Sequence, residues 1–149
     1  VTGLDLVELQ LRVAAGESLP ITQDDVVITG HAIEVRVVAE DPAAGWMPST
    51  GRIDRFHIGE GVRVDSGVEE GTAVTPWYDS LLAKVVAHGE TRAVAVERMA
   101  RALDEMLVDG PATNLPLLRA IVADGAGPVC AAAAPLPDGC RGSAAAHGR

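Results

Sequence analysis

Cysteine is scarce in this sequence of 149 residues, and both copies, Cys130 and Cys140, lie in a stretch of low complexity. Disulfide-stabilised domains and zinc sites need cysteines at regular or closely paired positions, with further ligands nearby. The sequence therefore predicts neither a disulfide framework nor a metal site. We expect the protein to reside in a reducing, cytoplasmic compartment.

Clustered basic residues and long apolar runs are lacking as well. Twelve Lys and Arg residues stand against 21 Asp and Glu, the net charge is −9, and the basic residues are scattered along the chain. A surface that binds nucleic acid or an anionic membrane needs clustered positive charge. No apolar run approaches the roughly 18 residues that cross a bilayer, and Val1-Thr2-Gly3 does not begin a signal peptide. We expect neither nucleic acid nor a membrane as a partner.

Apolar residues repeat with helical or strand spacing along most of the chain. Three stretches have the three- and four-residue spacing of amphipathic helices: 4–14, 91–107 and 113–122. Thr2 is expected to cap the first helix, Gly16 to end it in the left-handed conformation, and Asp109-Gly110-Pro111 to stop the second. Four further stretches predict strands: 31–39, 53–58, 62–65 and 80–88.

The strand expected at 31–39 alternates regularly between apolar and polar residues. Ile33, Val35 and Val37 fall on one face, and Glu34 and Arg36 fall on the other. The short connections between strands favour antiparallel pairing. The predicted fold is α+β, a small and mainly antiparallel β-sheet with flanking helices.

Three regions are predicted along the chain. Residues 1–20 are expected to form a helical segment, 21–123 the domain itself, and 124–149 a low-complexity tail. Alanine, glycine and proline dominate the tail, and these side chains bury too little apolar surface to offset the entropy lost on ordering. We therefore expect the tail to be disordered.

Two polar positions on the alternating strand form a candidate site. Glu34 and Arg36 share a face, and a guanidinium stays charged at any working pH and can hold an anion in a fixed fork. The spacing alone also fits the commoner alternative, a solvated ion pair on an ordinary sheet surface.

Other polar features predict structure rather than chemistry. Gly59-Glu60-Gly61 lacks the further glycines and the following helix of a phosphate loop, so it predicts a hairpin turn. Lys84 lies in an apolar run, where an ion pair with a carboxylate such as Asp79 is expected. The histidines outside the tail are too far apart in sequence to predict a metal site or a catalytic triad: His31, His57 and His88.

Several short motifs follow one another along the chain. They are TGLDLVE at 2–8, GHAIEVR at 30–36, AEDP at 39–42, PSTG at 48–51, PWYDSLLAK at 76–84 and TN at 113–114. In this order and at this spacing, the stretch from Val1 to Ala123 resembles the carboxyl-terminal part of the biotin carboxylase family. The resemblance implies the fold of that family's carboxyl-terminal domain for 21–123, with the helix at 1–20 following an ATP-grasp region.

The resemblance also implies an activity and a role for Arg36. In the family, ATP and bicarbonate form carboxyphosphate, which yields carbon dioxide, and a deprotonated ureido nitrogen of biotin attacks it. The family's arginine that faces the ureido oxygen lies in the motif that Arg36 matches, which makes Arg36 the candidate catalytic and substrate-binding residue. Glu34, beside it, is the candidate orienting partner. The complete parent enzyme would bind biotin, ATP and Mg²⁺.

Much of the family's catalytic machinery is not in this sequence. The metal-binding carboxylates, the catalytic glutamate and the phosphate-binding lysines belong to the ATP-grasp region, which would precede Val1. The first residue is also not methionine. Both observations suggest a fragment, which we expect to be inactive alone and to bind none of these ligands tightly.

The resemblance implies partners as well. They are the missing ATP-grasp region, a biotin carboxyl carrier domain and a carboxyltransferase component, and the neighbourhood of Val62 and Arg63 would lie near a homodimer interface. The alternative is a noncatalytic docking or dimerisation module, or the remnant of a pseudogene. The acceptor of the parent enzyme, whether an acyl-CoA, pyruvate or urea, is chosen by a different domain.

Overall fold

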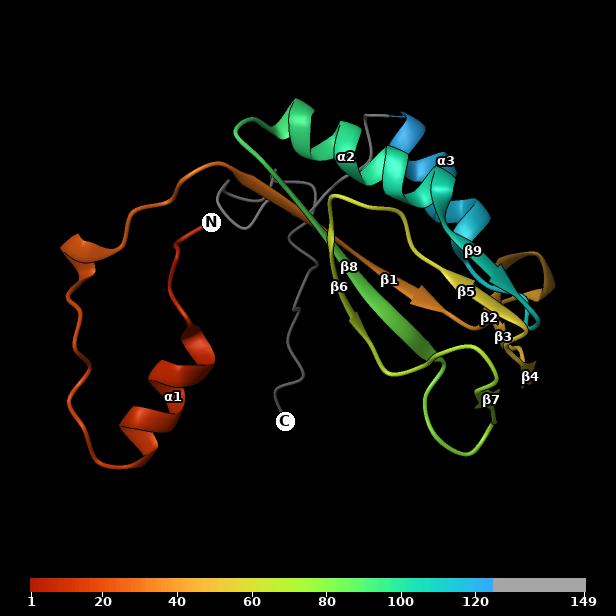
Figure 1. The fold of residues 1–149 in the computed structure, drawn as a ribbon, viewed down its shortest axis with the longest axis horizontal. Coiled ribbons are helices and arrows are strands. Elements are labelled where there is room, and N and C mark those ends of the chain that lie inside the picture. Colours follow the sequence, from red (N-terminus) through yellow and green to blue (C-terminus); the bar gives the residue numbers. More distant parts are fainter. Residues whose placement is uncertain (125–149) are drawn as a thin grey trace, which may run out of the picture.

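The structure is a computed structural model that describes residues 1–124 of the chain (Figure 1). Its helices are α1 (Leu6–Ala14), α2 (Arg92–Glu105) and α3 (Leu115–Asp124), with short 3-10 turns η1 (Gln23–Asp25) and η2 (Pro42–Ala44). Its strands are β1 (His31–Val38), β2 (Glu40–Asp41), β3 (Met47–Pro48), β4 (Gly51–Arg52), β5 (Arg55–His57), β6 (Arg63–Ser66), β7 (Ala73–Val74), β8 (Leu81–Gly89) and β9 (Leu107–Asp109). Except for Asp124, which ends α3, the tail that the sequence predicts to be disordered lies outside the described residues.

Three strands form the central antiparallel sheet, in the order β1-β8-β6. The alternation predicted for β1 is confirmed, because Ile33 and Val37 are buried whereas Glu34 and Arg36 are exposed. The middle strand, β8, is buried or half-buried at every position except His88. This burial accounts for its nearly continuous apolar sequence.

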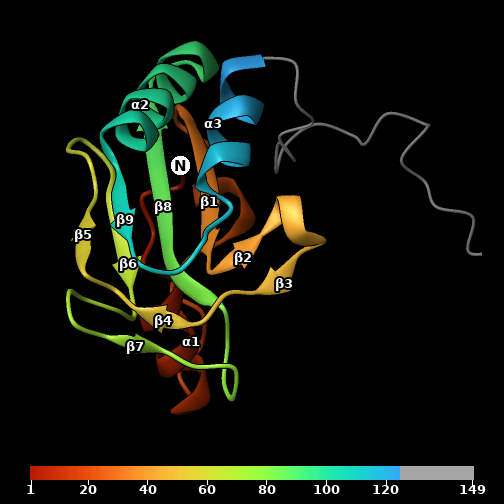
Figure 2. The ribbon, with the colours of Figure 1, turned by 90° about the vertical axis from the view of Figure 1, so that its right-hand side faces the viewer.

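Helices α2 and α3 cover one face of this sheet (Figure 2). Helix α2 buries Ala95, Met99, Ala102 and Leu103, which recur with the helical period, and it packs against β8 and β1. Helix α3 packs against α2 and contacts β1. The core consists of these buried side chains: Ile33, Val37, Ala39, Ile53, Val74, Leu82, Val85, Ala87, Ala95, Met99, Leu103, Met106 and Leu115.

Helix α2 begins as predicted but ends earlier. Thr91 caps it, its hydroxyl accepting a backbone N–H of the first turn at 3.3 Å. The helix ends at Glu105 rather than Leu107, because Met106 is extended and Leu107 pairs with β5. The strand predicted at 53–58 is confirmed in a shorter form, because β5 covers Arg55–His57 within that stretch and pairs with β9.

Helix α1 has a different cap from the one predicted. The Asp5 carboxylate accepts the N–H groups of Val7 and Glu8 at 3.0 and 2.9 Å, so the helix begins directly after Asp5, and Thr2 is not its cap. Gly16 follows the helix with a φ of +90°, the left-handed conformation expected there.

Helix α1 lies apart from the sheet (Figure 1). None of its residues is buried, and Leu6, Val7 and Leu11 are 60%, 64% and 67% exposed. Its apolar face therefore has no partner surface among residues 1–124.

The loop at 59–61 connects β5 to β6, which pair with different strands, so the predicted hairpin turn is wrong. The predicted class is confirmed, because the described sheets are antiparallel and the helices flank them. In the part of the chain that the structure describes, no helix is long and apolar enough to cross a membrane.

Candidate functional site

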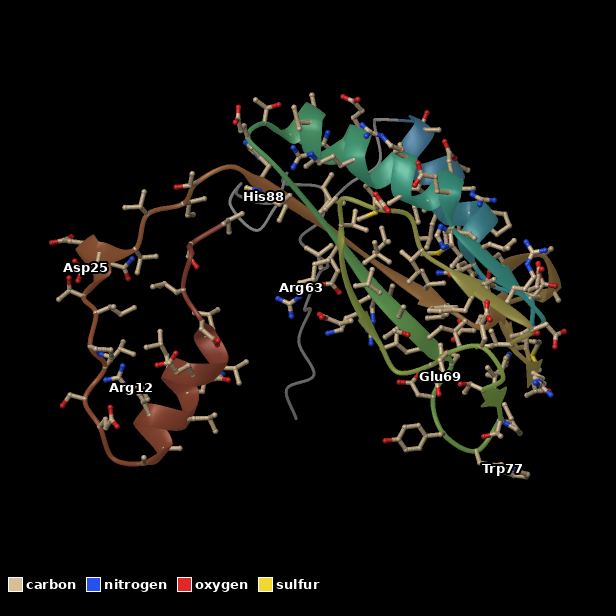
Figure 3. The ribbon with its side chains drawn as sticks, in the orientation of Figure 1. Arg12, Asp25, Arg63, Glu69, Trp77 and His88 are labelled. Atoms are coloured by element: carbon tan, nitrogen blue, oxygen red, sulfur yellow. The ribbon has the colours of Figure 1, made fainter. Side chains whose placement is uncertain are left out.

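The face of the central sheet opposite α2 and α3 carries charged side chains. Arg36 on β1 pairs with Lys84 on β8, which in turn pairs with Asp65 on β6. Directly paired residues of antiparallel strands project to the same face, so these three side chains form one row across the sheet. Glu34 and Arg63 lie in the next row, on either side of β8. We call the surface formed by these five residues the polar face; Figure 3 shows Arg63 on it.

The ion pair on the polar face lies on β6. Arg63 Nε is 3.0 Å from Asp65 Oδ1, and this contact raises the pKa of Arg63 above its ordinary value. Within residues 1–124, Arg36, Glu34 and Lys84 take part in no ion pair. The solvated Glu34–Arg36 pair that the spacing allowed is therefore not formed, and the Arg36 side chain is exposed without a bound carboxylate.

Lys84 does not have the partner that the sequence suggested. The Asp79 carboxylate instead accepts the Leu81 N–H at 3.1 Å. Lys84 is half-buried and stands opposite Asp65 in the β6–β8 register. The lysine thus adds a second cation to the row that contains Arg36.

The backbone at Arg36 is held from outside the sheet. Asn114, directly before α3, is buried, and its carboxamide donates to the Arg36 carbonyl and accepts the Val38 N–H, both at 3.0 Å. The Asn114 N–H also donates to the Val38 carbonyl at 3.2 Å. The sequence did not reveal this contact, because an asparagine just before a helix is expected to be a cap.

Two adjoining hollows, of about 280 and 210 Å³, lie beside the loop that leads into β8. Tyr78 and Asp79 line both hollows, and Arg36 lines neither. Arg36 therefore lies on an open surface and not in either hollow.

A metal ion needs several ligands that converge. Among residues 1–124, no three His, Cys, Asp or Glu side chains lie close enough together to hold one ion. The side chains described here thus do not fit a magnesium site of their own.

The sequence matches a known family and several long relatives. Residues 34–127 match the biotin carboxylase C-terminal domain. The biotin carboxylase of Pseudomonas aeruginosa is 52% identical over 128 residues, which cover 85% of this chain and 28% of that protein. The mitochondrial propionyl-CoA carboxylase alpha chain of Caenorhabditis briggsae is 47% identical over 127 residues, which cover 82% of this chain and 17% of that protein. The chain therefore spans less than a third of the length of these relatives.

Solved structures resemble the chain to a similar extent. One is the biotin carboxylase domain dimer of Hydrogenobacter thermophilus 2-oxoglutarate carboxylase, in complex with MgADP, ADP and bicarbonate. It matches with a TM-score of 0.80 and 43% identity over 83% of this chain and 28% of that one. The urea carboxylase of Kluyveromyces lactis matches with a TM-score of 0.79 and 40% identity over 83% of this chain and 11% of that one. Since the family match and the structural likeness agree, this chain belongs to the biotin carboxylase family, of which it contains the carboxyl-terminal domain.

Proposed function

We propose that this chain supplies the carboxyl-terminal domain of a biotin carboxylase, in which Arg36 assists the ATP- and bicarbonate-dependent carboxylation of biotin. The position of Arg36 carries the proposal: the side chain is exposed, has no ion pair within residues 1–124, and lies on the sheet face opposite the helices. The relatives support the reaction, because they include biotin carboxylases and a carboxylase bound to MgADP and bicarbonate.

The ureido nitrogen of biotin is a poor nucleophile, which defines the task of Arg36. When that nitrogen loses its proton, negative charge develops on the ureido oxygen. A guanidinium already held in place would stabilise this charge by roughly 3 kcal/mol, the contribution of a typical oxyanion donor. Arginine suits the task because it keeps its proton and presents several N–H donors in a fixed fork.

Glu34 is the proposed partner of Arg36 in binding biotin. The two residues are two positions apart on β1, so their side chains leave the same face roughly 7 Å apart. An ionised carboxylate can only accept hydrogen bonds. Glu34 would therefore contact a ureido N–H or orient the guanidinium once biotin is bound.

The phosphoryl chemistry of the reaction would depend on the remainder of the parent enzyme. An ATP-grasp region would bind ATP and Mg²⁺, and a biotin carboxyl carrier domain would bring biotin to the polar face. A carboxyltransferase component would then use the carboxylated biotin. A homodimer with 62–63 near its interface is proposed by analogy with the dimeric relative, and the cytoplasm is the proposed compartment.

A rebuilt enzyme tests the proposal. The full chain is joined behind the amino-terminal region of the Pseudomonas aeruginosa biotin carboxylase, to which it is 52% identical. We expect the joined protein to show bicarbonate-dependent ATP cleavage and biotin carboxylation, and the chain alone to show neither, because residues 1–124 hold no cluster of metal ligands. Phosphate release and incorporation of radiolabelled bicarbonate into biotin measure the two activities.

The amino-terminal region alone is the control. Bicarbonate-dependent phosphate release by the pure chain would contradict the proposed division of labour. A rebuilt enzyme that folds and cleaves ATP but carboxylates no biotin would favour the noncatalytic docking module.

A further inference from the structure

Asn114 is a polar residue in an otherwise apolar core. It is 7% exposed, and in the part of the chain that the structure describes it is the one polar residue that is buried. Burying a carboxamide costs free energy unless its donors and acceptor are hydrogen-bonded. The identity of its partners therefore indicates what this residue does.

Both groups of the carboxamide bind the main chain of β1. Oδ1 accepts the Val38 N–H and Nδ2 donates to the Arg36 carbonyl, each at 3.0 Å, across 76 and 78 residues of sequence. The side chain thus occupies the free edge of β1, whose other edge pairs with β8. A carboxamide can make both bonds at once, whereas a carboxylate has no donor and an alkyl side chain has neither group.

These hydrogen bonds lie next to the point where the pairing of β1 with β8 becomes irregular. The β1–β8 register shifts between Val37 and Val38, so the ladder is interrupted directly after Val37, one residue beyond Arg36. At this point Asn114 supplies contacts to residues 36 and 38 from the opposite edge. The backbone conformation at Arg36 sets the direction of its Cα–Cβ bond and therefore the position that its guanidinium can reach.

We propose that Asn114 is a positioning residue for Arg36, which it aims at the substrate by fixing the main chain of residues 36–38. This inference rests on the proposed function of Arg36. Asn114 would act from the free edge of β1, without touching a reacting atom. A displacement of about 1 Å of a catalytic group lowers a rate by on the order of a hundredfold.

The first test uses the full chain and amide hydrogen exchange measured by NMR. Asn114→Asp keeps the acceptor for the Val38 N–H, so this amide should stay protected. Asn114→Leu removes the acceptor, so the same amide should exchange at least about tenfold faster. Unchanged exchange in Asn114→Leu would show that the carboxamide does not hold the strand.

The second test uses the rebuilt enzyme. Asn114→Asp should lower biotin carboxylation by about tenfold to a hundredfold and bicarbonate-dependent ATP cleavage by less than about threefold. In an Arg36→Lys background the same change should have less than about a threefold further effect, since the two residues act as a unit. Thr113→Val, which removes only the hydroxyl that accepts the Leu115 N–H at 3.4 Å, is the matched control and should lower neither activity by more than about threefold.

The outcomes separate the two claims. If Arg36→Lys alone leaves biotin carboxylation unchanged, the proposed function of Arg36 is wrong. If Arg36→Lys lowers biotin carboxylation, three results would each show that the positioning role is wrong. Asn114→Asp could leave biotin carboxylation unchanged, it could lower both activities equally, or its full effect could add to that of Arg36→Lys.

Discussion

The exposure of Arg36 depends on the register of β1. Ile33 and Val37 are buried under α2, and Arg36 is exposed because it is one position out of phase with them. A slip of a single residue would place the guanidinium in the core and two apolar side chains in water. Because an unpaired buried charge costs several kcal/mol, the free energy that selects the register also exposes the proposed catalytic group.

Gly110 makes a turn that no other residue can make without strain. Its φ is +128°, and a Cβ at this position would collide with the Arg52 carbonyl oxygen. We expect Gly110→Ala to lower the free energy of unfolding by at least about 3 kcal/mol. Urea denaturation of the full chain measures the loss.

Gly61 is the matched control for this prediction. Its φ is also positive, at +78°, but a Cβ there would have no heavy atom within 4 Å. Gly61→Ala should therefore cost only the left-handed backbone strain, about 1 to 2 kcal/mol. Equal losses at the two glycines would show that the close contact with Arg52 does not matter.

At the scale of elements, α2 depends on α3 for the stability of its last turn. The final carbonyl groups of a helix lack partners within the helix and carry its negative end. The Arg119 guanidinium donates to the carbonyls of Leu103 and Met106, both at 2.9 Å. These hydrogen bonds thus link α3 to the carboxyl end of α2.

Replacing Arg119 with methionine keeps much of the side-chain volume and removes the donors. We expect Arg119→Met to lower the free energy of unfolding by about 1 to 3 kcal/mol, as for the loss of a charged donor. Arg101→Met, which removes an exposed ion pair with Glu97 on α2, should cost less than about 0.5 kcal/mol. Chemical denaturation compares the two, and similar losses would contradict the capping role.

Long periodic elements could be predicted from the sequence, whereas short strands could not. The stretches that became β1 and most of α2 repeat their apolar residues over two or more pleats or turns, which specifies one geometry. Strands of two or three residues, such as β7 and β9, are too short to show a period. Met106 to Val108 is apolar throughout and fits either a helix or a strand, and pairing with β5 decides the outcome.

One part of the candidate site could likewise be predicted from the sequence, and another part could not. The common face of Glu34 and Arg36 follows from their spacing on one strand. The row that adds Lys84 depends on pairing between strands far apart in sequence, and the bonds of Asn114 depend on where α3 meets the edge of β1. Tertiary packing sets these relations, and the periodicity of a single sequence gives no information about that packing.

At the scale of the whole molecule, the described chain has two surfaces without partners. The polar face of the sheet lies opposite the helices, and the apolar side of α1 is exposed. A nine-residue helix is shorter than the roughly 12 to 15 residues that an isolated helix needs in water. We propose that the rest of the parent enzyme covers both surfaces.

Arg36→Lys in the rebuilt enzyme tests the central claim, that this domain contributes Arg36 to the biotin half of the reaction. The change is on the solvent side of β1 and opens no core cavity, so the stability loss should stay within about 1 kcal/mol. Lysine keeps the charge but not the guanidinium fork, and Arg36→Ala keeps neither. Biotin carboxylation should fall on the order of a hundredfold to a thousandfold in Arg36→Ala and by less in Arg36→Lys.

The decisive measurement is the ratio of the two losses in the same Arg36 variants. Biotin carboxylation and bicarbonate-dependent ATP cleavage are assayed side by side, with the unchanged rebuilt enzyme as reference. We predict that carboxylation falls much further than ATP cleavage, because the role proposed for the guanidinium is at the ureido oxygen and not at the phosphates. Equal losses in both activities, or no loss in either, would contradict the account.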